Sequence, residues 1–339
     1  MPAKALTESR KSIYLDWSTF VDAFRGIDAP ANDPARALHD LVVRLSAGEN
    51  LCFSLTHVWE LLHQENPASR VAIARWLDRL DLVWVYSDND VIKREVLHAV
   101  LDAVRGTKTP APLPAAASFF SLFEAWDAES LGYALAHPTL ADFVDVAGSA
   151  PSLMARLARF RELSVQSARR LYDDRITGLQ QVDRAAMEEE LDRKVRANLQ
   201  VDVAEAAALL RKDPASGFHR NQSGIFVAPT DAEVAAAVNG FPDLTVLPFI
   251  FLFHRALRAM SFEIIARPST ASRAFEQQRG DLYDLTHLVG AAYADVFTCD
   301  TRTARRLDNG RDLLGRPPPI TAVGGPAAVA QHIEAQVAR

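Results

Sequence analysis

The chain of 339 residues is 49% hydrophobic and 24% charged, which excludes a mainly disordered, collagen-like or coiled-coil protein. Its formal net charge of -6 argues against a nucleic-acid binder held by bulk positive charge, but it allows a local basic groove or a cluster of carboxylates around a cation. With only Cys52 and Cys299, no disulfide framework forms, so we expect a reducing compartment, the cytoplasm. The longest apolar run, residues 244–253, is about half of the ~20 residues of a membrane span, and we expect neither a membrane partner nor a secretory signal.

Strand and helix signals alternate in the first part of the chain. Short β-prone runs predict strands at 12–16, 51–55 and 82–86. Apolar residues at helical spacing predict helices at 17–24, 34–48, 56–64, 67–80 and 88–104. Because parallel strands need crossover connections, this alternation predicts an α/β fold with a parallel sheet.

A Pro-rich break at 108–114 ends this pattern, and residues 115–239 carry almost no strand signal. Beyond them the predicted elements are helices at 249–266 and 270–293, a strand at 295–299, a helix at 301–307, a turn at 317–319, a strand at 320–323 and a last helix. The α/β pattern thus stands at both ends of the chain. We therefore expect one discontinuous α/β core, residues 11–104 and 240–339, that carries an all-helical insertion at 105–239.

Acidic residues follow the predicted strands or lie on the helices after them. Asp16 follows the first strand, Glu60 lies on the helix after the second, and Asp300 follows strand 295–299. Asp281 and Asp284 are three residues apart and share a helix face. Open α/β sheets bind ligands at these strand ends, and clustered carboxylates favour a hard divalent cation such as Mg²⁺ or Mn²⁺.

These segments resemble the PIN-domain nucleases, a family that includes VapC-type toxins. The matching motifs are hydrophobic-Asp16-x-Ser18-x-Phe20, Ser54-Leu-x-x-x-x-Glu60-Leu61, Asp284-x-x-His287 and Asp295-x-Phe297-Thr298-x-Asp300, within residues 11–104 and 270–325. The resemblance implies a three-layer α/β/α sandwich with a central parallel sheet, in which three or four acids hold one or two divalent metal ions. The helical block has no counterpart in the compact form of the family.

The resemblance also implies roles for single residues. The catalytic metal ligands, binding directly or through water, would be Asp16, Glu60, Asp284 and Asp300, with Asp281 as a further ligand or a helix-start acid. We favour Asp284 over Asp281 because small residues follow it, as the family helix requires: Gly290, Ala291 and Ala292. Ser18 and Thr298 would orient neighbouring carboxylates, and Asp295 either solvates the strand entry or faces the site.

Each acid also has a purely structural explanation. Asp16 or Asp300 could cap the helix that follows it, Asp284 could satisfy a helix N-terminus, and Glu60 could be a solvated helix residue. These explanations and the metal site stay open at this point. His287, one turn from Asp284, fits a packed or hydrogen-bonding residue better than a ligand.

Other function classes have weaker support. His57, Glu60 and His63 share one helix face, which suggests zinc, but the two histidines are not four residues apart as in zinc proteases. The sequence contains no phosphate-binding P-loop, dinucleotide fingerprint or nucleophile elbow. NTPases, dinucleotide-dependent enzymes and α/β-hydrolases therefore lack their defining residues here.

We expect a divalent-metal-dependent nuclease that hydrolyses phosphodiester bonds, acting on RNA rather than DNA and resembling a toxin in its role. The alternative is a catalytically inactive PIN-like scaffold that binds a partner through the helical insertion. An antitoxin or other protein partner and a homodimer stay open. Arg-rich stretches at 156–175 and 255–279 fit either a phosphate-binding wall or a structural cap.

Overall fold

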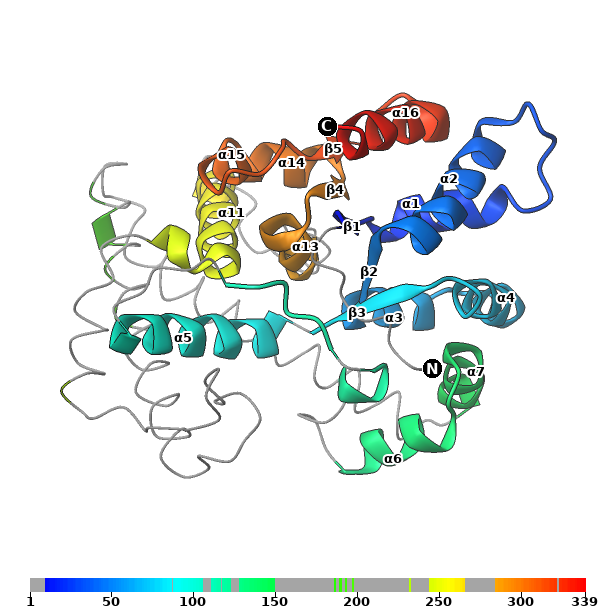
Figure 1. Ribbon diagram of the computed structural model, residues 1–339, viewed down its shortest axis with the longest axis horizontal. Coiled ribbons are helices and arrows are strands. Elements are labelled where there is room, and N and C mark those ends of the chain that lie inside the picture. The colour runs from blue at the N-terminus through cyan, green and yellow to red at the C-terminus, as the bar shows by residue number, and fades with distance from the viewer. Residues whose placement is uncertain are drawn as a thin grey trace.

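The structure is a computed structural model, drawn in Figure 1. It describes residues 10–86, 88–105, 111–116, 118–122, 128–149, 244–265, 284–321 and 323–339, with the single positions 186, 189, 190, 193, 197 and 232. In this part of the chain, five parallel strands form one sheet. The predicted α/β fold with a parallel sheet is therefore confirmed.

The sheet has the order β3-β2-β1-β4-β5. The strands are β1 Ser12–Tyr14, β2 Asn50–Ser54, β3 Leu82–Val85, β4 Val296–Cys299 and β5 Ile320–Thr321. Ile13 of β1 pairs with Leu51 on one side and with Val296 on the other. The chain therefore builds the sheet outward in one direction from β1 to β3 and in the other direction from β4 to β5. The boundary between β1 and β4 is the topological switch point, where open α/β sheets bind their ligands.

Helices connect these strands. The first group comprises α1 Trp17–Arg25, α2 Pro34–Gly48, α3 Leu55–Leu62, α4 Pro67–Leu77 and α5 Asp88–Arg105, followed by η1 Phe120–Leu122, α6 Ala128–Ala136 and α7 Leu140–Ser149. The second group comprises η2 Leu244–Val246, α11 Pro248–Ile265, η4 Leu285–His287, α13 Leu288–Tyr293, α14 Thr301–Leu307, α15 Gly310–Leu313 and α16 Gly325–Val337. Most predicted elements are thus confirmed within a few residues. The predicted helix at 270–293 is described only from residue 284. No helix in the described ranges is long and apolar enough to cross a membrane.

Local sequence explains several of these helix starts. Asp33 accepts the backbone N–H of Ala35 at 2.8 Å, and Asn66 accepts those of Ala68 and Ser69 at 2.9 and 3.2 Å. A proline follows each cap, where its missing N–H costs no helical hydrogen bond. Caps and prolines of this kind set the starts of α2 and α4.

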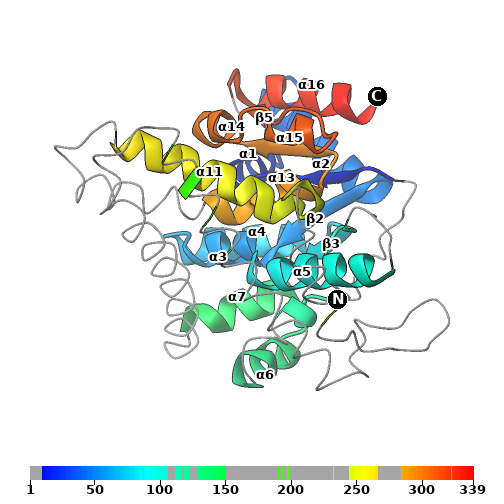
Figure 2. The same cartoon turned by 90° about the vertical axis from the view of Figure 1, so that its left-hand side faces the viewer.

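Helices pack on both faces of the sheet. Side chains of a strand alternate between its two faces, so neighbouring residues enter different hydrophobic clusters. Ile13 and Phe53 pack with residues of α1 to α4, whereas Tyr14 and Phe297 pack with residues of α11 and α13. Figure 1 shows α5, α11 and α13 on the left of the strands and α1, α2 and α4 on the right. In Figure 2 the side of the molecule that carries α5 and α11 faces the viewer.

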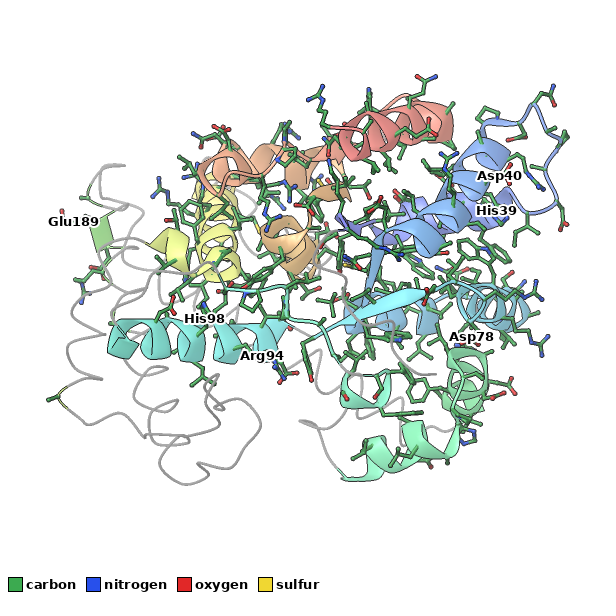
Figure 3. The ribbon with its side chains drawn as sticks, in the orientation of Figure 1. His39, Asp40, Asp78, Arg94, His98 and Glu189 are labelled. Carbon is green, nitrogen blue, oxygen red and sulfur yellow. The ribbon has the colours of Figure 1, made fainter. Side chains whose placement is uncertain are left out.

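Part of the predicted insertion packs with the sheet. Ala116 donates its N–H to the carbonyl oxygen of Trp84 at 2.7 Å, along the free side of β3. The two carboxylate oxygens of Asp78, at the end of α4, accept the N–H groups of Leu140 and Ala141 at 2.8 and 2.9 Å and so hold the start of α7 (Figure 3). Most of the range 150–239, and with it the Arg-rich stretch 156–175, lies outside the described residues. The limits of the insertion stay a prediction.

Candidate active site

Asp16 lies two residues beyond the end of β1 and immediately before α1. Its Oδ1 accepts hydrogen bonds from Thr298 Oγ1, at 2.7 Å, and from the hydroxyl of Thr19, and its Oδ2 accepts one from Ser18 Oγ at 2.5 Å. The backbone N–H of Asp16 donates in turn to Thr298 Oγ1 at 2.7 Å. The Thr298 hydroxyl thus joins β1 to β4 across the switch point. Three hydroxyl donors fix the direction of the Asp16 carboxylate, and two of them are the predicted orienting residues.

Asp300 lies in the equivalent place beyond β4 and is more exposed. Its Oδ1 accepts the N–H groups of Arg302 and Thr303 at 2.6 and 3.1 Å, and its Oδ2 accepts the hydroxyl of Thr303 at 2.6 Å. Asp300 therefore caps α14, one of the structural explanations open from the sequence. Partial burial acts to raise the pKa of Asp300, but the hydrogen bonds from Thr303 and Arg302 outweigh it and lower that pKa.

Glu60, on α3, pairs with a buried histidine. Its Oε2 lies 3.0 Å from Nε2 of His287, and the Glu60 side chain is 31% exposed. Burial acts to lower the pKa of His287, but the charge and hydrogen bond of Glu60, with the charges of Asp284 and Asp16, outweigh it and raise that pKa. His287 is therefore a hydrogen-bonding residue beside the acids, as expected.

Asp284 precedes η4 and is partly buried. Burial raises the pKa of the Cys299 thiol, and the charges of Asp300, Asp16 and Asp284 raise it further. The predicted ligands therefore act on neighbouring buried groups at the same edge of the sheet. Asp281 lies outside the described residues, so the choice between Asp281 and Asp284 stays a prediction.

The described acids fit a divalent cation by their chemistry but do not converge on one point. Among the residues that the structure describes, no group of three or more His, Cys, Asp or Glu side chains is arranged to hold a metal ion. Hydrogen bonds engage both oxygens of Asp16 and Asp300 and one oxygen of Glu60. Each carboxylate oxygen has two lone pairs, and Oδ1 of Asp16 and of Asp300 each already accept two hydrogen bonds. The remaining acceptor capacity therefore lies on the Oδ2 atoms of the two aspartates and on Glu60. Mg²⁺ and Mn²⁺ prefer such hard oxygen donors.

Asp295 lies away from the other predicted site residues. It directly precedes β4, its Oδ2 accepts the N–H of Ser12 at 2.8 Å, and its Oδ1 pairs with Arg316 at 2.5 Å. Because Ser12 begins β1 and the strands are parallel, Asp295 lies at the amino ends of the strands, opposite Asp16. Of the two roles that the sequence left open, the one at the strand entry is therefore confirmed, and the other, a role facing the site in support of the ligands, is wrong.

A buried chain of polar side chains lies beside the acids, and neither its connections nor the part of Tyr14 in it was predicted from the sequence. The Tyr14 hydroxyl lies 2.9 Å from Nδ1 of His287 and 2.8 Å from Oγ of Ser54. The backbone N–H of Ser54 donates to Nδ1 of His57 at 2.9 Å, and Nε2 of His57 lies 2.7 Å from the carbonyl oxygen of Leu15. The available signal was a polar residue at the last position of each strand, Tyr14 in β1 and Ser54 in β2. Because both ring nitrogens of His57 are engaged, the zinc hypothesis loses one of its ligands.

No protein-family model matches the chain, and no curated protein or solved structure matches it significantly. The fold and the site must therefore define its class by themselves. They define an α/β protein with a parallel sheet whose oriented carboxylates lie at the carboxyl ends of β1 and β4.

Proposed function

We propose that the protein is a divalent-metal-dependent nuclease, acting on RNA, with a PIN-like three-layer α/β/α core. The observation that supports this best is the hydrogen-bonded link between Asp16 and Thr298 across the switch point, with Asp300 next along β4. Carboxylates at this edge lie where α/β sheets bind ligands. Fixing a carboxylate by hydroxyl donors is how proteins orient a ligand before the metal arrives.

The same sheet order occurs in dinucleotide-binding proteins, but the turn after β1 argues against that class. Those proteins need glycines there, so that the backbone can approach the pyrophosphate. Here the turn is Asp16-Trp17-Ser18-Thr19, with a large buried indole and a carboxylate. A negative carboxylate repels a phosphate but attracts a cation. The site therefore favours phosphate binding through a metal ion.

In this proposal, the carboxylates of Asp16, Glu60, Asp284 and Asp300 would bind the Mg²⁺ or Mn²⁺ ion directly or through coordinated water. When bound, such an ion lowers the pKa of a coordinated water and stabilises the charge that builds on phosphate oxygens. The residues of the chain orient the ligands: the hydroxyls around Asp16 fix that carboxylate, and His287 holds one oxygen of Glu60.

Cleavage of single-stranded RNA in Mn²⁺ or Mg²⁺ tests the proposal. We expect Asp16→Ala and Asp300→Ala each to lower kcat by about a hundredfold or more, as expected when a metal that supplies several kcal/mol is lost. Asp22→Ala is the matched control, because Asp22 lies on α1 and pairs with Arg25 at the surface. Unchanged cleavage by both site variants, or full cleavage in EDTA, would remove the catalytic proposal.

A non-catalytic scaffold is the second candidate. It is favoured by the lack of a three-residue metal group among the described residues. Calorimetric titration with Mn²⁺ separates the two candidates. Absence of both Mn²⁺ binding and RNA cleavage favours the scaffold, whereas binding that Asp16→Ala abolishes favours the nuclease.

A further inference from the structure

Glu60 is held through one oxygen only. Its Oε2 lies 3.0 Å from Nε2 of His287, and no described residue bonds its Oε1. The side chain of Glu60 is 31% exposed, whereas that of His287 is 8% exposed. We propose that His287 is a positioning residue, which fixes the Glu60 carboxylate from inside the protein and leaves Oε1 for the metal ion. This inference rests on the proposed function, since it assigns Glu60 a ligand role.

The opposite side of the His287 ring is held as well. Its Nδ1 lies 2.9 Å from the hydroxyl of Tyr14, whose side chain is fully buried. That hydroxyl lies 2.8 Å from Oγ of Ser54, at the end of β2. Both ring nitrogens of His287 are therefore engaged, and the ring cannot turn without breaking a buried hydrogen bond.

At the far end of this chain, a backbone contact fixes which ring nitrogen of His57 carries the proton. A backbone N–H can only donate, so Nδ1 of His57 accepts from Ser54 and Nε2 of His57 donates to the carbonyl oxygen of Leu15. The Ser54 hydroxyl can then donate to Tyr14, the Tyr14 hydroxyl to Nδ1 of His287, and Nε2–H of His287 to Glu60. In this arrangement each proton has an acceptor. A carboxylate can only accept, so Nε2 of His287 carries the proton of this bond and donates it to Glu60.

Packing around Tyr14 depends on Gly290, one of the small residues that follow Asp284. A Cβ atom built on Gly290 would lie 2.2 Å from the Tyr14 ring, so only glycine lets α13 approach β1 this closely. The helix that follows His287 thus rests on the ring whose hydroxyl holds His287. Backbone packing and hydrogen bonding fix the same pair of residues.

Metal affinity in matched variants tests the inference. His287→Leu removes the donor at similar volume, and we expect it to weaken Mn²⁺ binding by about tenfold or more, the usual effect of losing a residue that orients a ligand. His287→Gln keeps an N–H near the position of Nε2, and we expect it to restore most of the affinity. Tyr14→Phe removes only the hydroxyl, and we expect a smaller loss. His332→Gln, at an exposed position of α16, is the matched control and should bind like the wild type.

A measurement without metal separates this inference from the proposed function. We expect Glu60→Gln to shift the ¹⁵N resonances of the His287 ring, and Asp300→Asn to leave them unchanged. Unshifted His287 resonances in Glu60→Gln, or equal Mn²⁺ affinity in His287→Leu, His287→Gln and the wild type, overturn the positioning role while the nuclease proposal stands. If the wild type binds no Mn²⁺ but His287 responds to Glu60→Gln, the contact is real and the metal function fails. Thermal unfolding of each variant shows whether a loss reflects misfolding.

Discussion

The junctions β1–Asp16–α1 and β4–Asp300–α14 share one local design. In each, an aspartate follows a strand, adopts almost the same backbone angles, φ -68° and ψ 163° or 161°, and begins a helix. Each aspartate also accepts the hydroxyl of a threonine three residues later, Thr19 or Thr303. Local sequence and backbone alone would give both carboxylates the same role.

The side chains nevertheless bond to different partners. Asp300 accepts two backbone N–H groups of its own helix, whereas Asp16 makes no side-chain bond to the backbone of α1. Asp16 is bonded instead to Thr298 on the neighbouring strand. One aspartate is primarily a helix cap, and the other links two strands at the switch point. The hydrogen-bond partners of such a carboxylate are therefore set by the neighbouring strand rather than by the local sequence motif.

Glu95 is a third carboxylate that caps a helix, and it is fully buried. Of the three, we expect it to have the largest effect on the free energy of unfolding. Its oxygens accept the N–H groups of Phe249 and Ile250 at 2.5 and 3.0 Å, at the start of α11, and the Tyr293 hydroxyl. Burial raises the pKa of Glu95 to about 7 from an ordinary value of 4.5, although these hydrogen bonds oppose it. An acid with a raised folded-state pKa stabilises the fold most below its unfolded pKa, and this contribution is lost as pH rises through the folded pKa.

We therefore expect the contribution of Glu95 to the free energy of unfolding to fall by on the order of 3 kcal/mol between pH 4.5 and about 7. Glu95→Gln should flatten this dependence, as measured by urea unfolding across that range. Glu334→Gln, on the exposed face of α16, should leave it in place. An unchanged slope in Glu95→Gln would show that Glu95 is not the titrating group.

The substitution Thr298→Val tests directly whether the neighbouring strand sets the direction of the Asp16 carboxylate. It removes the hydroxyl that accepts the Asp16 N–H and donates to the Asp16 carboxylate, while side-chain volume changes little. We expect a loss of about 2 kcal/mol in unfolding free energy, because a partly buried N–H loses its acceptor. We also expect the carboxylate to turn toward the first N–H groups of α1, as in the Asp300 junction. Urea unfolding and a crystal structure check both effects.

Thr301→Val, at the exposed start of α14, is the control for this change and should leave stability close to that of the wild type. If the Thr298→Val structure keeps Asp16 in its present direction, then Ser18 and Thr19 suffice to orient it. The difference between the two junctions would then be local after all.

Substitutions at Asp300 should have the smallest effect on the free energy of unfolding, and they test whether this residue acts as a helix cap. Asp300→Ala removes a helix cap and should cost about 1 kcal/mol, whereas Asp300→Asn keeps a capping oxygen and should cost little. Because the pKa of Asp300 is lowered, its contribution is present above pH 3.8 and is lost as pH falls through the folded pKa. Unfolding curves at neutral and acid pH check both points. Equal losses in the two variants would mean that charge rather than capping stabilises α14.

Much of the fold was predictable, because its signals are local. Apolar spacing predicted the helices, and short β-prone runs predicted the strands within a few residues of their observed bounds. The role of Asp295 was open in the sequence because it stands between a helix and a strand, and only its bonds to Ser12 and Arg316 show which end it serves. The role of Glu60 was equally open, because its partner His287 is 227 residues away.

The sequence by itself determined the α/β class and the acids that follow strands, since periodicity and residue order are properties of short segments. Only the tertiary structure decided that β1 and β4 are neighbours, that Thr298 bonds Asp16 and that Tyr14 bonds His287. These two contacts join residues 282 and 273 positions apart. Their formation depends on sheet order and on the close packing of α13 against β1, which are set by the burial of the whole chain rather than by any local pattern.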